Sequence, residues 1–136
     1  MNINHGIVAL VIKDDKFLLL KDSRALMLDY WGPPHGRCEE SDENEEETVK
    51  REVFEETNLN VDPQKKLWTT EADTKVKTVS FWLTDFVSGE VVIDSDESSE
   101  FGWFTVDEIL NLKLYPGTKD FFNLVKNGLV VIDKIQ

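Results

Sequence analysis

The sequence predicts a mixed α and β fold, arranged as a single domain over residues 1–136. Three features predict this class: two apolar runs within residues 6–22, a stretch of good helix formers over 43–58, and alternating apolar and polar residues over 76–86. Apolar residues make up 40% of the 136 positions and include four Trp and eight Phe. That content is sufficient for one hydrophobic core, and no linker or internal repeat divides the sequence.

Overall composition narrows the possible partners and the compartment. The formal net charge of −12 argues against broad duplex nucleic-acid binding, which depends on clustered Lys and Arg. The sequence has no run of 18 apolar residues and no charged leader with a cleavage site, so we expect no membrane contact and a cytoplasmic location. With only Cys38, His5 and His35, an internal disulfide and a Cys- or His-rich metal site are not expected. None of these features favours a particular oligomeric state.

The first predicted elements form a hairpin over residues 6–22. The runs GIVALVI and KFLLL are joined by Asp14-Asp15, a plausible turn, and their Val, Ile and Phe content favours strands over a helix. Because both runs are almost continuously apolar, we expect them to be buried on both faces, as in a sheet covered by helices. The segment from Trp31 to Gly36 is then a loop that two prolines stiffen and in which glycines allow close backbone approach.

A helix is predicted from about Glu43 to residue 57. Ser41 or Asp42 can act as its N-cap, and Asn58 can adopt the left-handed conformation that ends a helix. Glutamates gathered in the first turn suit the positive end of the helix dipole.

Two faces of this helix differ in character. Val49 and Val53 fall on an apolar side, whereas three carboxylates fall together on another at i, i+3 and i+4; these are Glu52, Glu55 and Glu56. Like charges at that spacing cost about 0.2–0.5 kcal/mol per pair. A divalent cation would reverse the sign of this interaction, and Mg²⁺ prefers such oxygen ligands together with substrate phosphates. The simpler alternative is a solvated acidic face without a ligand.

The order of residues from Gly36 to Leu59 resembles the Nudix box, G-x5-E-x7-R-E-U-x-E-E-x-G-U, in which U is apolar. The segment REVFEETNL, residues 51–59, matches the core of the box, and Glu43 lies at the correct distance before it. Two departures occur: Gly36 lies seven residues before Glu43 instead of six, and Asn58 replaces the final glycine. The second change is mild because Asn tolerates a left-handed backbone.

The resemblance to Nudix hydrolases implies an α/β/α sandwich around a mixed β-sheet for almost the whole chain. It implies a small-molecule nucleotide substrate and a Mg²⁺ site that Mn²⁺ can also fill. The implied ligands are Glu52, Glu55, Glu56 and the carbonyl of Gly36, with Glu55 and Glu56 also counted as catalytic. A cation of this kind would bridge an acidic protein and an anionic substrate.

Arg51 would be structural in the same interpretation. It lies eight residues, just over two helical turns, after Glu43, so its long side chain can pair with that carboxylate and steady the loop before the helix. The alternative is a screened surface pair, worth at most about 1 kcal/mol.

After this helix the chain is predicted to alternate short strands and turns. The expected elements are an extended segment at 59–61, a turn at 62–63, strands at about 66–71 and 76–86 with a turn at 73–74, and a short strand at 90–93. Lys77 lies on an otherwise apolar face of the strand at 76–86. It either extends to solvent or faces the substrate phosphates at the end of the strand.

A polar acidic loop is predicted at residues 94–100, and its simplest interpretation is a flexible, solvated loop. In the Nudix pattern, however, a carboxylate about six residues before Trp103 approaches the metals and can activate the attacking water. Glu97 has that spacing. It is therefore assigned the role of general base, with Asp96 and Glu100 as alternates.

Three further residues are candidates for substrate binding. Arg24 follows the hairpin in a region that borders the nucleotide pocket of Nudix enzymes, although basic residues at a strand end are ordinary. His35 can donate to a phosphate or leaving group, and its alternative is a solvent-facing loop histidine. Tyr115 can stack on a base in the family context, with core or rim packing as its alternative.

Helices are predicted for the C-terminal part. Thr105 and Glu108 form a capping box that opens a short helix. Thr118 is predicted to cap a last helix that ends near residues 127–128, and residues 129–133 can add a terminal strand.

The sequence therefore predicts a Mg²⁺-dependent pyrophosphohydrolase of a nucleoside diphosphate linked to another moiety. The stretches KTVSFWL and WGPPHG resemble the asymmetric diadenosine tetraphosphate hydrolases, a Nudix subgroup that commonly has Lys where this chain has His35. They favour a dinucleoside polyphosphate such as diadenosine tetraphosphate as substrate. The alternatives are a MutT-like (deoxy)nucleoside triphosphate pyrophosphatase, an ADP-ribose hydrolase and a non-catalytic nucleotide-binding module. A purely structural acidic protein fits the complete carboxylate set least well.

Overall fold

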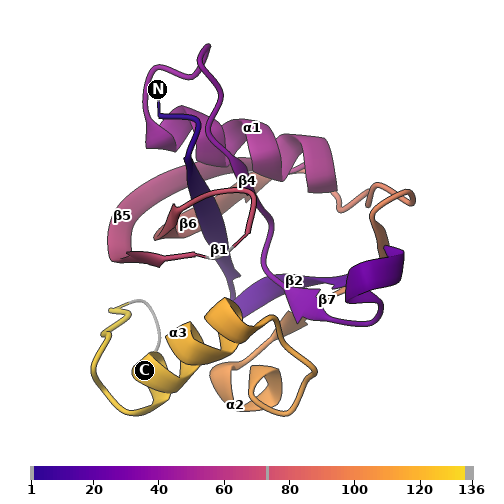
Figure 1. Ribbon diagram of the computed structural model, residues 1–136. Coiled ribbons are helices and arrows are strands. Elements are labelled where there is room, and N and C mark those ends of the chain that lie inside the picture. The colour runs from indigo at the N-terminus through magenta and orange to yellow at the C-terminus, as the bar shows by residue number, and fades with distance from the viewer. Residues whose placement is uncertain (1, 73, 134–136) are drawn as a thin grey trace.

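A computed structural model describes residues 2–72 and 74–133, and its centre is a mixed β-sheet (Figure 1). The strands follow the order β3-β2-β1-β6-β5, with β4 added to β1 and β7 to β2. β1 and β6 run parallel, and the other pairs are antiparallel. The strands are β1 (His5–Lys13), β2 (Lys16–Asp22), β3 (Trp31–Gly32), β4 (His35–Arg37), β5 (Asn60–Glu71), β6 (Thr78–Ser88) and β7 (Ser98–Phe104). The helical elements are the 3-10 turn η1 (Ala25–Met27), α1 (Glu45–Thr57), α2 (Val106–Ile109) and α3 (Pro116–Lys126).

Helices cover the sheet from both sides, with α1 on one face and α2 and α3 on the other (Figure 1). Alternate residues of β1 belong to two separate clusters of buried side chains. Ile7 and Val11 pack in the cluster that contains Val49 of α1, whereas Leu10 packs in the cluster that contains Phe121 of α3. The predicted α/β/α sandwich is confirmed, as is the burial of the first hairpin on both faces.

Several local sequence signals are confirmed. Asp14 and Asp15 form the turn between β1 and β2, with positive φ angles of 52° and 63°. Asn58 has a φ of 64° and its N–H donates back into α1, so it ends this helix in the left-handed conformation. Thr105 and Glu108 form both hydrogen bonds of a capping box at the start of α2.

Two helices begin at residues other than those predicted. The N-cap of α1 is Asn44, whose side chain accepts a first-turn N–H at 2.9 Å, and not Ser41 or Asp42. The carboxylate of Asp42 is instead engaged by an arginine, as described below. α3 begins at Pro116, two residues before the predicted cap Thr118, because proline is preorganised for the first helical position and lacks the N–H that would need a partner there.

The middle of the chain forms longer strands than predicted. β5 continues through the turn expected at 62–63, because β5 lies at the end of the strand order and an edge strand tolerates a proline. A shift of register between Pro63 and Lys65 accommodates the missing donor. β7 begins at Ser98, inside the predicted acidic loop, which is thus shortened at its end. Asp73, half of the turn predicted at 73–74, lies outside the described residues.

Two predicted short strands are wrong. Residues 90–93 form no strand; the N–H of Val92 donates to the carbonyl of Thr57 at 3.0 Å and fastens this segment to the end of α1. Residues 129–133 form no strand either, because the N–H of Leu129 donates to the carbonyl of Leu124 at 2.9 Å and continues the turn at the end of α3. Among the described residues, no helix is both long enough and apolar enough to cross a membrane.

The sheet topology brings β4, the end of β2, the start of β7 and Tyr115 close together. β4 pairs with β1 so that Gly36 lies opposite Ile7, and β7 pairs with β2 so that Ser98 lies opposite Asp22. Tyr115 stands directly before α3 and is connected to β3 through the N–H it donates to the carbonyl of Trp31, at 3.3 Å. The end of β2, the start of β7, β4 and Tyr115 therefore surround one region beside α1.

Candidate active site

The carboxylate face of α1 lies against β4. The carboxyl group of Glu52 is in such close contact with Gly36 that a Cβ at position 36 would overlap it. Glu56, one turn further along, accepts the backbone N–H of His35 at 3.1 Å. The glycine at position 36 is therefore required for the approach of Glu52, and the predicted proximity of Gly36 to the helix carboxylates is present.

Glu52 and Glu56 have raised pKa values. Burial raises the pKa of Glu52 to about 7; the adjacent Arg51 opposes this rise, and the negative charges of Glu55 and Glu39 add to it. Burial also raises the pKa of Glu56 well above its ordinary value, and the charge of Glu52 contributes in the same direction. Two such carboxylates are unfavourable as anions side by side, so they favour either a proton or a bound cation.

Glu55 is placed differently. Its side chain is 58% exposed, compared with 15% for Glu52, and it lies 3.5 Å from a guanidinium nitrogen of Arg51. Within residues 2–72 and 74–133, no three His, Cys, Asp or Glu side chains are gathered closely enough to form a ready metal cage. The ligand set of Gly36, Glu52, Glu55 and Glu56 thus stays a prediction.

The chemistry of these residues fits a hard divalent cation. The donors are all oxygens, and two of the carboxylates are partly buried, with pKa values that burial and neighbouring negative charges raise. Mg²⁺ takes oxygen ligands and usually keeps several waters, so a site that is incomplete without water and substrate phosphates is typical of it.

Arg51 contacts Asp42 rather than the predicted Glu43, and its guanidinium also lies against Glu39, Glu52 and Glu55. Its Nε and Nη2 donate to the two carboxylate oxygens of Asp42 at 3.2 and 2.9 Å, and Nη2 also donates to the carbonyl of Arg37 at 3.1 Å. The hydrogen bonds from Arg51 hold the pKa of Asp42 at about 2. Asp42 lies six residues after Gly36, so the extra residue of the box falls between Asp42 and Arg51.

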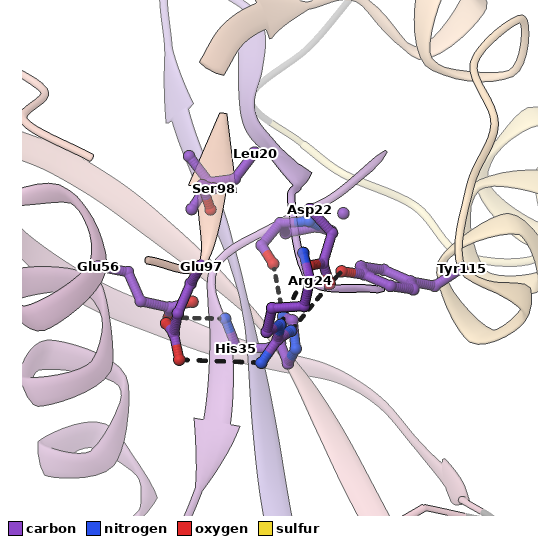
Figure 2. Close-up of a pocket in the computed structure, with 10 residues that line it drawn as sticks. Leu20, Asp22, Arg24, His35, Glu56, Glu97, Ser98 and Tyr115 are labelled. Atoms are coloured by element: carbon purple, nitrogen blue, oxygen red, sulfur yellow. Dashed lines mark hydrogen bonds and ion pairs between the residues drawn. The ribbon is translucent and has the colours of Figure 1, made fainter. Parts of the chain in front are cut away.

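A pocket beside the helix carboxylates brings together five predicted residues: Arg24, His35, Glu56, Glu97 and Tyr115 (Figure 2). The other residues lining it are Leu20, Asp22, Gly32, Pro33 and Ser98.

Lys77 does not line this pocket. It is exposed just before β6, and its N–H donates to the carbonyl of Asn4 at 2.8 Å. Of the two interpretations of Lys77, extension to solvent is the one that this placement supports.

Asp22 is a residue of this pocket that sequence reasoning missed. Its side chain is 1% exposed and accepts two hydrogen bonds from the Arg24 guanidinium, at 3.0 and 2.8 Å, and one from the Tyr115 hydroxyl. Burial alone would raise the pKa of Asp22, but these hydrogen bonds outweigh it and lower the pKa to about 2. The only sequence signal was an acid that ends an apolar strand two residues before an arginine.

The ring of Tyr115 is partly buried and packs against neighbouring residues. It stacks on Tyr30 with ring centroids 5.8 Å apart, meets His35 edge-on at 5.6 Å, and would overlap a Cβ placed on Gly32. This is the packing alternative to base stacking, and burial followed by the hydrogen bond to Asp22 raises the pKa of the tyrosine hydroxyl.

Glu97 is the acidic residue of the predicted loop at 94–100 that lines the pocket. Its carboxylate lies 3.8 Å from Nη1 of Arg24, and its negative charge contributes to the raised pKa of Glu56. The alternate Glu100 pairs with Lys21 at 3.3 Å instead. His35 is exposed, and its ring Nδ1 donates a hydrogen bond to the carbonyl of Pro33 at 3.0 Å.

Comparison with known proteins identifies the family of this chain. Residues 3–125 match the family model of the NUDIX domain. The chain is also 32% identical over 122 residues to a Bacillus subtilis (strain 168) protein described as the uncharacterized Nudix hydrolase YvcI, an overlap of 85% of this chain and 74% of that protein.

Solved structures extend the similarity. The MutT protein from Methanosarcina mazei Go1 is 27% identical with a TM-score of 0.73, covering 92% of this chain and 94% of its own. A C. elegans Ap4A hydrolase has a TM-score of 0.72 over 92% of this chain and 96% of its own, but at 19% identity this similarity concerns the fold alone. The chain therefore belongs to the Nudix family and is a hydrolase of phosphorus-containing anhydrides in nucleotide-linked substrates.

Proposed function

We propose that this chain is a Mg²⁺-dependent pyrophosphohydrolase, with Mn²⁺ as a substitute, that cleaves a dinucleoside polyphosphate such as diadenosine tetraphosphate. The observation that carries the proposal is the pair of partly buried carboxylates, Glu52 and Glu56, beside a pocket that also contains the guanidinium of Arg24. This arrangement supplies one region for a cation and an adjacent region for an anionic phosphate.

Glu52, Glu55, Glu56 and the carbonyl of Gly36 would hold the cation. When bound, the cation would neutralise the polyphosphate and lower the pKa of the attacking water. Glu52, Glu55 and Glu56 lie on α1, which packs on the sheet. The carboxylates are therefore positioned before substrate arrives, which reduces the cost of organising the reaction.

The pocket residues have separate roles in the proposed reaction. Arg24 binds a phosphate and His35 donates to a phosphate or to the leaving group, while Glu97 accepts a proton from the attacking water. The water oxygen forms a bond to phosphorus as the phosphoanhydride P–O bond breaks. The electron pair of that bond leaves with the departing phosphate, and the water proton passes to Glu97.

The choice of a dinucleoside polyphosphate rests on the stretches WGPPHG and KTVSFWL, which resemble the asymmetric diadenosine tetraphosphate hydrolases. The fold itself favours no substrate, since a protein named MutT and one named Ap4A hydrolase have nearly equal TM-scores, 0.73 and 0.72. Nucleoside triphosphates and ADP-ribose are the alternative substrates of the same site.

A substrate panel tests the proposal. Diadenosine tetraphosphate, ADP-ribose, NADH and ordinary and oxidised nucleoside triphosphates are incubated with the protein, with Mg²⁺ or with EDTA, and the products are resolved by chromatography. We expect ATP and AMP from diadenosine tetraphosphate, in the Mg²⁺ samples only. Cleavage of another compound would replace the substrate, and no metal-dependent turnover of any compound by folded protein would contradict the enzymatic proposal.

A further inference from the structure

Asp22 holds Arg24 in one orientation. The carboxylate of Asp22 accepts the backbone N–H of Arg24 at 2.8 Å, Nε at 3.0 Å and Nη2 at 2.8 Å. The remaining guanidinium nitrogen, Nη1, is the one that lies near Glu97, at 3.8 Å. Two of the three guanidinium nitrogens are thus engaged by a buried acid, and the third faces the pocket.

The support for Arg24 is itself fixed by packing. Asp22 is almost fully buried, and the hydroxyl of Tyr115 donates to the carboxylate oxygen that also accepts Nη2 of Arg24. The tyrosine ring is in turn stacked on Tyr30. Movement of Arg24 away from Asp22 would leave a buried carboxylate without its counterion, which is strongly unfavourable. The guanidinium is therefore preorganised.

Glu97 is held near this guanidinium by its own backbone. The N–H of Ser23 donates to the carbonyl of Glu97 at 2.9 Å, and Ser98 pairs with Asp22 across β7 and β2. The Arg24–Glu97 pair is long and both side chains are nearly half exposed, at 48% and 45%, so water screens the pair and we expect it to be weak. A phosphate, with more charge and several acceptor oxygens, competes well against such a pair.

We propose that Arg24 pairs with Glu97 in the substrate-free protein and exchanges it for a substrate phosphate, with Asp22 and Tyr115 as positioning residues. Binding of an anionic substrate then frees Glu97 from Arg24. This inference rests on the proposed function, in which Glu97 accepts the proton of the attacking water. It couples the presence of substrate to the availability of that carboxylate, because one guanidinium group serves both partners in turn.

Binding of inorganic pyrophosphate without metal, measured by titration calorimetry, tests the exchange. In the Glu97→Gln variant the competing partner is removed, so we expect the dissociation constant to fall about threefold. In an Arg24→Gln background the same Glu97→Gln change should alter the dissociation constant by less than about 1.5-fold, because the shared group is gone. An equal fall in both backgrounds, or no fall in either, would overturn the proposal.

Two controls separate this exchange from general effects. Glu90→Gln removes an exposed acid from the segment between β6 and β7, and should leave pyrophosphate binding within about 1.5-fold of the wild type. Tyr115→Phe removes only the hydroxyl that supports Asp22, and we expect it to weaken binding about threefold without unfolding the protein. Unchanged binding in Tyr115→Phe would contradict the positioning role.

The outcome is distinguishable from a failure of the proposed function. Pyrophosphate binding requires no turnover, so the Arg24 and Glu97 variants report on the exchange whatever the substrate is. If Glu97→Gln binds pyrophosphate threefold more tightly than the wild type, but the wild type hydrolyses no member of the substrate panel, the exchange is supported and the proposed reaction is contradicted. Metal-dependent turnover by the wild type, with equal pyrophosphate binding by Glu97→Gln and the wild type, would support the proposed reaction and contradict the exchange.

Discussion

The ionised forms of Glu52 and Glu56 are poorly stabilised by the surrounding protein. Both lose hydration in the folded state, and nearby negative charges raise the cost of ionising each of them. Arg51 compensates Glu52 in part, through a hydrogen bond of 2.8 Å. Their charge state therefore links the stability of the metal-free protein to pH and to added cations.

The pKa of Glu52 gives a testable pH dependence. The group titrates near 4.5 in the unfolded chain and near 7 in the folded protein, so its contribution to stability is full below pH 4.5 and is lost as the pH rises through 7. We expect Glu52→Gln to raise the free energy of unfolding of metal-free protein by about 2 kcal/mol at pH 8. Urea denaturation at pH 8 and pH 5 measures this difference.

The same experiment with cation gives the matching result. Mg²⁺ should stabilise the wild type at pH 8 and stabilise Glu52→Gln much less, because a ligand that binds only the folded state raises its stability. Equal stabilisation of both proteins, or a metal-free variant that is less stable than the wild type, would contradict this account of Glu52.

Asp42 and Glu43 are neighbours with very different predicted effects. The carboxylate of Asp42 is buried and accepts hydrogen bonds from Arg51, from the Thr48 hydroxyl at 2.8 Å and from the N–H of Glu39 at 2.9 Å. We expect Asp42→Asn to lower the free energy of unfolding by about 2 kcal/mol at pH 7, and Glu43→Gln to change it by less than about 0.5 kcal/mol. Chemical denaturation of both variants checks this contrast.

The pH dependence of Asp42 is opposite in sign to that of Glu52. Its pKa is about 2 in the folded protein against 3.8 when unfolded, so it stabilises the fold above pH 3.8 and this contribution is lost as the pH falls through 2.

A larger loss of stability in Glu43→Gln than in Asp42→Asn would contradict this contrast and restore the original pairing of Glu43 with Arg51.

At the scale of elements, features that depend on residues close in sequence were predicted correctly, whereas features that depend on tertiary contacts were not. The Asp14-Asp15 turn, the end of α1 at Asn58 and the capping box of α2 depend on residues close in sequence, and all three are present. The continuous β5 could not be predicted, because a turn at residues 62–63 and an edge strand containing Pro63 have the same local sequence. Only the pairing with β6 decides between them.

The site divides in the same way. The Nudix box fixed the helix carboxylates by their spacing, and the relation of Gly36 to Glu52 followed from it. Asp22 was missed because its partners, Arg24 and Tyr115, are 2 and 93 residues away and no motif joins them. Several acids lie near Arg51 in the sequence, and only the folded loop places Asp42 rather than Glu43 against its guanidinium.

The contact between β4 and α1 gives a prediction for Gly36. A methyl group at this position would overlap the carboxyl of Glu52, so Gly36→Ala should displace that carboxyl while β4 stays paired with β1. We expect the variant to remain folded and to need at least about tenfold more Mg²⁺ for half-maximal turnover. Measurement of rate against Mg²⁺ concentration checks this result, with Gly117→Ala as control because a Cβ there meets no neighbour. An unchanged Mg²⁺ requirement would contradict the close approach of Glu52.

At the scale of the whole molecule, the α/β/α sandwich places the carboxylate face of α1 and the guanidinium of Arg24 at one pocket. Glu56 and Glu97 lie on one side of Arg24, and Asp22 and Tyr115 lie on the other (Figure 2). The chain carries a net charge of −12, which repels polyphosphates at long range. A cation at Glu52 and Glu56 and the guanidinium of Arg24 together would reverse that repulsion locally.

Turnover of diadenosine tetraphosphate by Glu56→Gln, with Glu46→Gln as the matched control, tests the central claim most directly. Both variants remove one charge from α1, but Glu46 is exposed on its outer face. With saturating Mg²⁺ we expect Glu56→Gln to lower kcat by at least about 100-fold and Glu46→Gln to lower it by less than twofold, as the loss of a cation ligand requires. Equal rates in Glu56→Gln and the wild type would contradict the assignment of catalysis to this helix face.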